Sequence, residues 1–561
     1  MTVATQPPDF TNQSPPLEEV DLFTGDQALT DAVTREGGGW AMAELSAFGR
    51  RIGSAEVQNW GRLANLHGPT PKLYARTGER LDEIEFHPAY HALMTLAVGQ
   101  GLHSAPWADP KQGAQVARAA GVILMVQAEA GVQCPITMTY GSVPTLRRAE
   151  DLARAWLPPL FSRSYDPRLA PLSEKTGVLL GMGMTEKQGG SDLRANVTRA
   201  TADGPNGAYR IDGHKWFLSA PMCDAFLILA QTGKGPSCFL LPRVLPDGTR
   251  NGLRLLRLKD KLGNRANASG EVVFEQATGF LIGEEGRGIP TIIDMGNHTR
   301  LDCALGSAGL MRAATAQALH HARYRTVFQR RLIDQPMMAA VLADLALESE
   351  AATALALRLA RAYEQAETVR DPEAEAALRR ILTPAAKFWI CKRGPALIAE
   401  AMEVLGGNGY IEDWPLARFY REAPVNSIWE GSGNIMCLDV IRALEKTRGG
   451  IEALLGELEP ARGANAAYDR RLARFKEILA GHRDGHGLAP GQERHVASDI
   501  ALLTQASLLL RHAPHAVGDA FCAARFGEAP GGVFGLIPAR NDVGAIDVGA
   551  IVARALPPSP P

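Results

Sequence analysis

The chain of 561 residues is 46% apolar and carries a formal net charge of −2. This length predicts three or four domains with sizeable cores, and the near-neutral charge excludes a polycation, so any contact with nucleic acid must use a local patch. The seven cysteines show no paired C-x-x-C spacing, which predicts free thiols in a cytoplasmic protein. The sequence shows neither a signal-peptide pattern nor an apolar run of membrane-spanning length, so we expect no membrane partner.

Residues 1–176 are predicted to form an N-terminal α-helical domain that begins with an arm. The first 16 residues are polar and interrupted by proline, which favours an extended conformation. From Asp26 to Leu160 the apolar residues mainly follow helical spacing, and Val116 to Ala130 contains few helix breakers.

Residues 177–287 have the short apolar runs of a β domain. Turn residues separate the runs, which favours a small barrel or sandwich. Asp212-Gly213-His214 lies between the runs Tyr209 to Ile211 and Lys215 to Phe217, and it predicts a hairpin turn because glycine accepts positive φ. The other expected strands are 178–180, 225–230, 238–241 and 271–274.

Helical spacing returns after Gly288. Met338 to Ala362 predicts one long helix and Thr383 to Leu405 another, which the glycine pair Gly406-Gly407 can end. We expect a helical bundle over residues 288–445 and an additional C-terminal helical domain over residues 446–561. The expected fold class is α+β, in the order α, β, α and then further α.

The segment from Gly183 to Ala195 is the most informative motif of the sequence. A strand-like run ends at Thr185, and the glycine pair Gly189-Gly190 and Ser191 follow within six residues. This arrangement lets backbone and short side chains approach a large ligand closely. A tight strand exit is the alternative interpretation, and the absence of a G-x-G-x-x-G pattern argues against a Rossmann site.

A second motif, Trp-Glu-Gly-Ser-Gly around Glu430, places a carboxylate among glycines. Beside apolar Ile428, this glutamate is a candidate desolvated base with a raised pKa, and a solvent-facing carboxylate is the alternative. Trp216 is either a core residue or a platform for a cofactor. The histidines, including His320 and His321, form no metal-ligand set and are expected at the surface, so we predict no metal.

Two long patterns carry a resemblance to the acyl-CoA dehydrogenase family. Gly183 to Ala195 fits the first family signature and Glu403 to Glu422 fits the second. Three segments, 184–192, 258–265 and 424–436, are similar to the flavoproteins of the family's bacterial alkylation-response branch, which add a C-terminal helical domain. The resemblance implies the acyl-CoA dehydrogenase fold: an N-terminal α domain, a central β-barrel or sandwich and a C-terminal four-helix bundle, here with an extra helical domain.

The resemblance also implies FAD as the cofactor and a homotetramer built as a dimer of dimers. The residues that match the strand-and-turn wall of the flavin site are Met182, Gly183, Met184, Thr185, Gly189, Gly190, Ser191, Trp216, Phe217 and Leu218. Those that match the opposite wall are Ile428, Trp429, Gly431, Ser432, Gly433 and Asn434. Arg325, Phe328 and Gln335 match a segment that reaches the FAD of a neighbouring subunit.

Glu430 matches the base that takes the α-proton of an acyl thioester in this family. Two departures from the family pattern predict weak activity on acyl-CoA. Leu218 stands where many members have a threonine whose hydroxyl meets the flavin, and Glu403 replaces the usual glutamine. Trp429 and Phe217 are bulky residues that narrow the expected substrate pocket.

The alkylation-response branch implies sequence-independent binding of double-stranded DNA through the added domain. Residues 446–561 hold 13 Lys and Arg against 12 Asp and Glu, a net charge of +1, so the domain is not basic overall. Arg442, Arg470, Arg471 and Arg474 are the candidate phosphate contacts, and a solvated helix surface is the alternative.

The leading hypothesis is an FAD-containing protein that protects DNA from alkylation and has weak, isovaleryl-CoA-like dehydrogenase activity. The first alternative is a metabolic short- or branched-chain acyl-CoA dehydrogenase without a DNA role. The second is a structural DNA-binding protein in which FAD serves only the fold.

Overall fold

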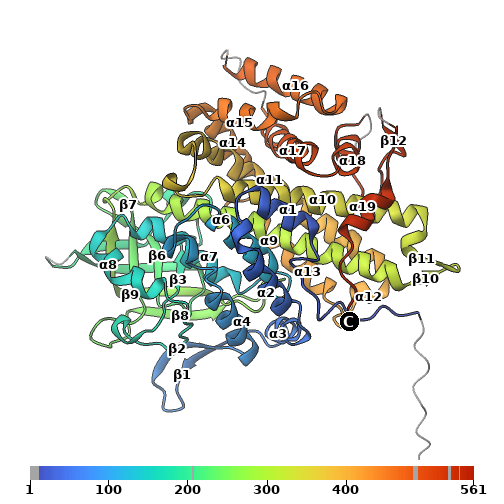
Figure 1. Ribbon diagram of the computed structural model, residues 1–561. Helices are drawn as coiled ribbons and strands as arrows, with labels where there is room; N and C mark the ends of the chain where they lie inside the picture. Colours follow the sequence, from blue (N-terminus) through green and yellow to red (C-terminus); the bar gives the residue numbers. More distant parts are fainter. Residues whose placement is uncertain (1–11, 205–206, 484–489, 528–531, 542–543, 561) are drawn as a thin grey trace, which may run out of the picture.

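The computed structural model describes residues 12–204, 207–483, 490–527, 532–541 and 544–560. Figure 1 shows a β domain on one side, long central helices and a layer of further helices above them. The predicted α+β class is confirmed. No helix among the described residues has both the length and the apolar character needed to cross a membrane.

The N-terminal part is helical, as predicted, except for one hairpin. Its helices are α1 (Gln27–Arg35), α2 (Met42–Ile52), α3 (Ala55–Leu66), α4 (Pro88–Gly99), α5 (Ala105–Ala108), α6 (Ala114–Met125), α7 (Gln133–Leu146) and α8 (Glu150–Leu160). Strands β1 (Thr70–Tyr74) and β2 (Arg80–Glu85) form the unexpected hairpin. Asp82 of β2 is buried and accepts a 2.9 Å hydrogen bond from the Leu255 N–H. A contact so remote in sequence explains why local periodicity did not reveal the hairpin.

The β domain is a seven-stranded sheet with the order β3-β5-β4-β6-β7-β9-β8. Its strands are β3 (Leu180–Gly183), β4 (Arg199–Ala202), β5 (Ala208–Ser219), β6 (Ala225–Thr232), β7 (Gly235–Pro242), β8 (Leu253–Leu258) and β9 (Ser269–Ile282). Further pairings join β3 to β6 and β5 to β9, so the sheet curls around a core of its own.

The predicted hairpin at Asp212-Gly213-His214 is wrong, because β5 runs without a turn through all three residues. A Cβ atom on Gly213 would lie 2.4 Å from the Thr198 hydroxyl oxygen. The glycine therefore serves a close approach between β5 and the segment that leads into β4.

The central bundle is built on three long helices. The helices of this part are α9 (Gly288–Tyr324), α10 (Pro336–Arg361), α11 (Pro372–Val404), α12 (Gly407–Tyr410), α13 (Leu416–Glu422) and α14 (Gly433–Lys446). The prediction that His320 and His321 lie at the surface is wrong: both are buried on α9, which is covered over most of its length. His320 and His321 bond to the Pro15 carbonyl and the Ser14 hydroxyl, which fixes the end of the N-terminal arm.

The last part adds further helices on top of α10 and α11 (Figure 1). They are α15 (Gly450–Leu458), α16 (Ala466–Arg483), α17 (Glu493–His512), α18 (His515–Phe526) and α19 (Val548–Ala555), with a short pairing of β12 (Arg540–Asn541) and β13 (Gly544–Ala545).

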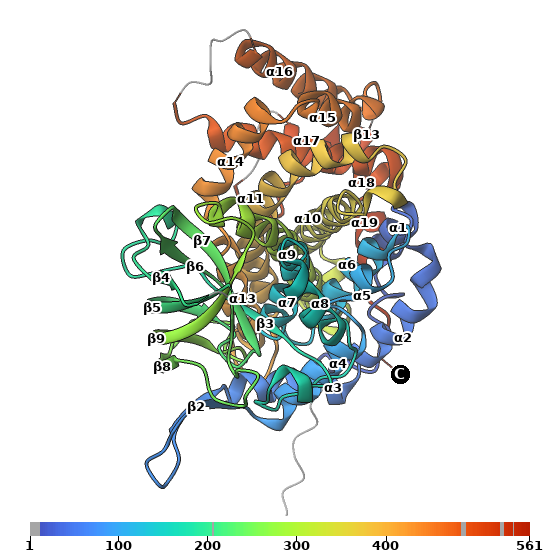
Figure 2. The same cartoon turned by 90° about the vertical axis from the view of Figure 1, so that its left-hand side faces the viewer.

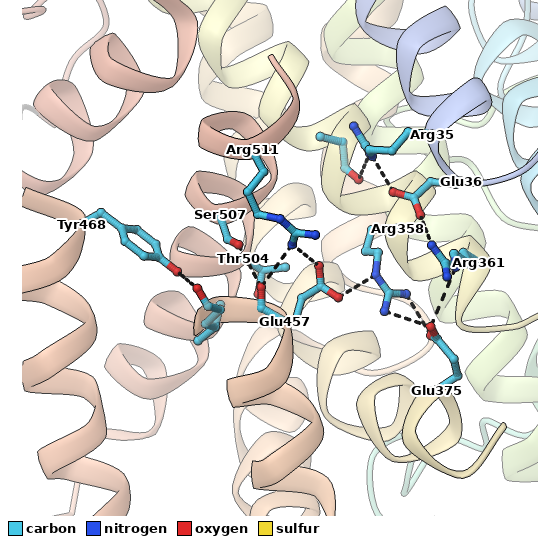
Figure 3. Close-up of polar contacts among 12 residues, drawn as sticks. Arg35, Glu36, Arg358, Arg361, Glu375, Glu457, Tyr468, Thr504, Ser507 and Arg511 are labelled. Carbon is cyan, nitrogen blue, oxygen red and sulfur yellow. Dashed lines mark hydrogen bonds and ion pairs between the residues drawn. The ribbon is translucent and has the colours of Figure 1, made fainter. Parts of the chain in front are cut away.

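A ladder of alternating charges joins the added helices to the rest of the molecule (Figure 3). Glu457 of α15 accepts from Arg511 at 3.2 Å and from Arg358 of α10 at 2.8 Å. Arg358 also donates to Glu375 of α11 at 2.9 Å and 3.1 Å. The series continues through Arg361, Glu36 and Arg35 to the end of α1.

Candidate functional site

The Glu430 side chain is held at α9 by a strained loop. Glu430 lies between the 3-10 turn Ala423–Ser427 and α14, and its φ of +58° is uncommon for a residue other than glycine. Its carboxylate accepts a 2.8 Å hydrogen bond from the Thr299 hydroxyl, and its backbone carbonyl accepts a 3.0 Å bond from Arg300. The loop therefore aims the carboxylate at one defined face of α9.

Lys387 of α11 holds the same loop through the loop's backbone carbonyls. Its buried ammonium group donates to the carbonyls of Asn426 at 3.0 Å and Gly431 at 2.7 Å. Sequence reasoning missed Thr299, Arg300 and Lys387, because they come from helices far along the chain and belong to no local pattern.

Glu430 is partly buried, and its surroundings shift the carboxyl group toward the neutral acid. Burial raises the pKa of its carboxyl group, while Thr299, Arg300 and Lys387 oppose the rise. Removal of water by burial favours the neutral acid, so the carboxylate that does form is more basic than an exposed glutamate.

The strand-and-turn wall is organised by a buried ion pair. β3, which contains Met182 and Gly183, leads through Met184 to Thr185, whose carbonyl accepts a 2.9 Å hydrogen bond from Trp216 on β5. The next residue, Glu186, accepts from Lys215 at 2.7 Å and from the Val197 N–H at 2.7 Å. This ion pair was not predicted. The sequence did contain a signal for it, because Glu186 follows Thr185 and Lys215 precedes Trp216.

The turn itself is accessible. Gly189 forms an isolated bridge with Glu186, while Gly190 and Ser191 are exposed. The turn therefore offers exposed backbone and the Ser191 hydroxyl to a ligand. The Glu186–Lys215 ion pair holds the start of the turn in place.

The three residues of β5 that were predicted to line the flavin site lie in different surroundings. Trp216 is half-buried, with the Lys259 ammonium 3.3 Å from its ring centroid, and Phe217 is 44% exposed. Leu218 is completely buried in the core of the β domain. It thus presents an alkyl group to that core at the position where the resemblance implies a hydroxyl in many family members.

Cys134 lies beside this wall, and the charge of Glu430 affects its thiol. It lies at the start of α7, buried, near the Ser219 hydroxyl of β5. Burial raises the pKa of its thiol to about 11, and the Glu430 carboxylate adds to the rise. Since Ser219 pairs with Met182, the end of β3 lies beside α7, and Figure 2 shows both next to α9.

The residues after Glu430 form the start of α14. Ser432 is the N-cap residue, and its side chain leaves the first N–H groups of the helix without a capping bond. Gly433 is buried and Asn434 is exposed. Asn434 also accepts a 3.0 Å hydrogen bond from Arg494 of α17. The added helices therefore contact the start of α14 directly.

Ile428 and Trp429 flank the catalytic candidate. Ile428 is 67% exposed, and Trp429 donates a 3.1 Å hydrogen bond to Asn426. Gly431 has a φ of +104°, a conformation in which a residue with a side chain would be strained.

Arg325, Phe328 and Gln335 are not brought to the Glu430 site of their own chain. They surround the hairpin of β10 (Thr326–Val327) and β11 (Arg330–Arg331), at the opposite end of the molecule from the β domain (Figure 1). Phe328 at the hairpin tip is 90% exposed.

The arginines predicted to contact DNA differ in their surroundings. Arg442, Arg470 and Arg474 are exposed on α14 and α16. Arg471 is half-buried and donates a 3.0 Å hydrogen bond to Asp499 of α17. The structure therefore assigns Arg471 to the packing of α16 on α17.

Three family models match successive parts of the chain. Residues 12–167 match the "Adaptive response protein AidB N-terminal domain", residues 181–277 the "Acyl-CoA dehydrogenase, middle domain", and residues 286–445 the "Acyl-CoA dehydrogenase, C-terminal domain". Together they span both signatures and the Glu430 loop.

Curated relatives and solved structures agree with these matches. The chain is 48% identical to the "Putative acyl-CoA dehydrogenase AidB" of Escherichia coli (strain K12) over 91% of its own length and 93% of that protein. It is 31% identical to the "Acyl-CoA dehydrogenase family member 11" of Caenorhabditis elegans over 84% of its length and 80% of that protein. A crystal structure of Caenorhabditis elegans ACDH-11 with C11-CoA matches 97% of this chain and 96% of that chain with a TM-score of 0.86 and 27% identity.

The chain therefore belongs to the acyl-CoA dehydrogenase family. Within that family it belongs to the AidB-like branch, which confirms the resemblance found in the sequence. Members of the family bind FAD, which confirms the predicted cofactor.

Proposed function

We propose that this protein holds FAD between the Thr185–Ser191 turn and the start of α14, and that Glu430 acts as a base toward an acyl thioester bound beside it. The observation that carries the proposal is the Glu430 carboxylate, which is partly buried, held by Thr299 at 2.8 Å and set on a backbone of positive φ. A pKa raised by burial together with backbone strain is characteristic of catalytic groups.

The residues present fit a flavin dinucleotide. Ser191 and the exposed turn offer a hydroxyl and bare backbone, and the uncapped start of α14 offers N–H groups that favour a negative pyrophosphate. Trp216 supplies an aromatic surface at the same wall. Arg325, Phe328 and Gln335 would then reach the FAD of another copy, which supports a homotetramer in which each site is completed by a neighbour.

The chain's own residues account for the proton transfer. Glu430 takes the proton from the carbon next to the thioester carbonyl, and Arg300 and Lys387 keep its loop in place through carbonyl contacts. FAD held between the Thr185–Ser191 turn and the start of α14 would supply the oxidising chemistry, as the acceptor for the hydride of the adjacent carbon. Leu218 provides no hydroxyl to the flavin, which supports a weak activity.

Anaerobic titration of the FAD-loaded protein with butyryl-CoA or isovaleryl-CoA tests this proposal. We expect slow loss of the visible flavin absorbance with stoichiometric formation of the unsaturated thioester. A flavin that stays oxidised in the presence of every acyl-CoA would contradict it. That result would favour the interpretation of FAD as a structural group.

We further propose that the protein binds double-stranded DNA without sequence preference and protects it from alkylation in the cytoplasm. The exposed Arg442 and Arg474 support phosphate contacts, as does the match to the AidB adaptive-response model. Contacts made only to phosphates would not distinguish sequences. The buried, unpaired state of all seven cysteines is compatible with a reducing compartment.

Replacing Arg442 and Arg474 together with alanine is expected to weaken duplex binding uniformly across sequences. Each lost phosphate contact should lower the slope of log K against log salt by about 1. Fluorescence anisotropy over a salt series measures the change. The control is Arg154→Ala, a change at an exposed side chain of α8; equal effects of both changes would refute a specific contact.

A further inference from the structure

The hairpin of β10 and β11 has an unfavourable turn. Its two strands pair over only two residues each. Both residues of the turn between them, Phe328 and Gln329, have positive φ, +52° and +65°. A turn with this backbone favours asparagine and glycine, because larger residues are strained in it. A two-stranded hairpin is also only marginally stable in water by itself, so this one needs support from the rest of the molecule.

The N-terminal arm supplies such support through Asn12. The side-chain amide of Asn12 donates to the Thr326 carbonyl at 2.8 Å and accepts from the Thr326 N–H at 2.6 Å. It therefore binds both backbone groups of the first hairpin residue, as a neighbouring strand would. The Asn12 carbonyl also accepts a 2.7 Å hydrogen bond from Arg325.

The arm is held in place next to Asn12. His320 of α9 bonds to the Pro15 carbonyl at 2.8 Å, and Asn408 of α12 donates to the Gln13 side chain at 3.4 Å. Asn12 itself has a φ of +65°, a conformation that asparagine adopts more readily than most other residues. The arm therefore links the hairpin to α9 and to α12.

Two of the three residues that are expected to reach a neighbouring FAD bond within their own chain. Gln335 donates to the Val327 carbonyl at 2.9 Å, and Arg325 donates to the Asn12 carbonyl. The third, Phe328, is 90% exposed at the tip of the hairpin. Phe328 is thus the side chain that the hairpin presents to another copy.

We infer that Asn12 is a positioning residue for the FAD site of another copy, because it holds the hairpin in the shape that presents Phe328 to that flavin dinucleotide. The inference rests on the proposed homotetramer, in which a neighbour completes each site. Asn12 acts on the cofactor through the hairpin. Without its two bonds to Thr326, the strained turn relaxes and Phe328 moves away from the flavin.

The equilibrium affinity of the full chain for FAD tests this inference. The FAD-loaded protein is diluted in steps, and the released flavin is measured by its fluorescence. Asn12→Ala is expected to raise the Kd of FAD roughly tenfold, the effect of losing two hydrogen bonds. Phe328→Ala is expected to raise it by at least as much. The double variant should bind FAD as Phe328→Ala does, because both changes act through one contact.

The matched control is Asn59→Ala, which changes an exposed asparagine of α3 that bonds to Arg62; its Kd should equal that of the unmodified protein. Asn12→Ala protein that binds FAD as tightly as the unmodified protein overturns the inference. So do effects of Asn12→Ala and Phe328→Ala that add in the double variant. Both outcomes leave the proposed site in place, provided that Phe328→Ala weakens binding. If Phe328→Ala alone leaves the Kd unchanged, the hairpin does not complete an FAD site, and the proposed tetrameric site fails together with this inference.

Discussion

Glu430→Gln is expected to slow the reduction of the bound flavin by butyryl-CoA by roughly 10²–10⁴-fold, the usual contribution of a positioned general base. The amide keeps the size of the side chain and can still accept a hydrogen bond from Thr299, so the content of FAD should stay unchanged. Stopped-flow absorbance under anaerobic conditions measures the rate. The unmodified rate should rise with pH, because burial raises the pKa of Glu430 and only the carboxylate accepts a proton.

The control for this change is Glu350→Gln. Glu350 lies on α10, burial raises the pKa of its carboxyl group, and its partner is Arg554 of α19. We expect normal flavin reduction in this variant. A Glu430→Gln protein that reduces its flavin at the normal rate would show that another group, or none, takes the proton.

Lys215→Met should destabilise the protein by about 3–5 kcal/mol, because it leaves the buried Glu186 carboxylate without its cation. Both side chains are almost completely buried, with 0% and 2% exposed. Although burial favours the neutral acid, Lys215 and the N–H donors of 197 and 198 hold the pKa of Glu186 below its ordinary value. Denaturant unfolding measures the loss, and the FAD retained after gel filtration should fall because the turn at Thr185 loses its anchor.

A second substitution distinguishes the effect of the unpaired Glu186 charge from that of the altered Lys215 side chain. Glu186→Gln added to Lys215→Met removes the unpaired charge and keeps an acceptor for the Val197 N–H. It should restore much of the lost stability and of the FAD content. If Lys215→Met alone unfolds at the same denaturant concentration as the unmodified protein, the ion pair has no such role.

The sequence revealed those parts of the site that are continuous along the chain. The Thr185 turn and the Glu430 loop are each compact motifs whose glycines and polar residues are informative by themselves. Thr299 and Lys387 could not be found in this way, since each acquires its role only when α9 or α11 packs against a distant segment.

The incorrect expectations have the same origin. Asp212-Gly213-His214 has the composition of a turn, but the glycine instead allows β5 to pass close to Thr198. The adjacent polar residues His320 and His321 suggested solvent exposure, yet α9 is enclosed by the N-terminal arm and the bundle. In both cases tertiary packing overrode a local preference.

The charge ladder that begins at Arg511 and ends at Arg35 has a practical consequence for experiments. The Glu457 side chain is 10% exposed. Arg358 pairs with two carboxylates, that of Glu457 and that of Glu375. Cutting the chain after residue 446 would remove Glu457, one of the two carboxylates that pair with buried Arg358, and leave it only Glu375. A truncated protein would then report damage to its core as well as the loss of its last helices. The appended helices are an integral part of the folded unit, so their role with DNA has to be measured by surface point substitutions in the intact chain.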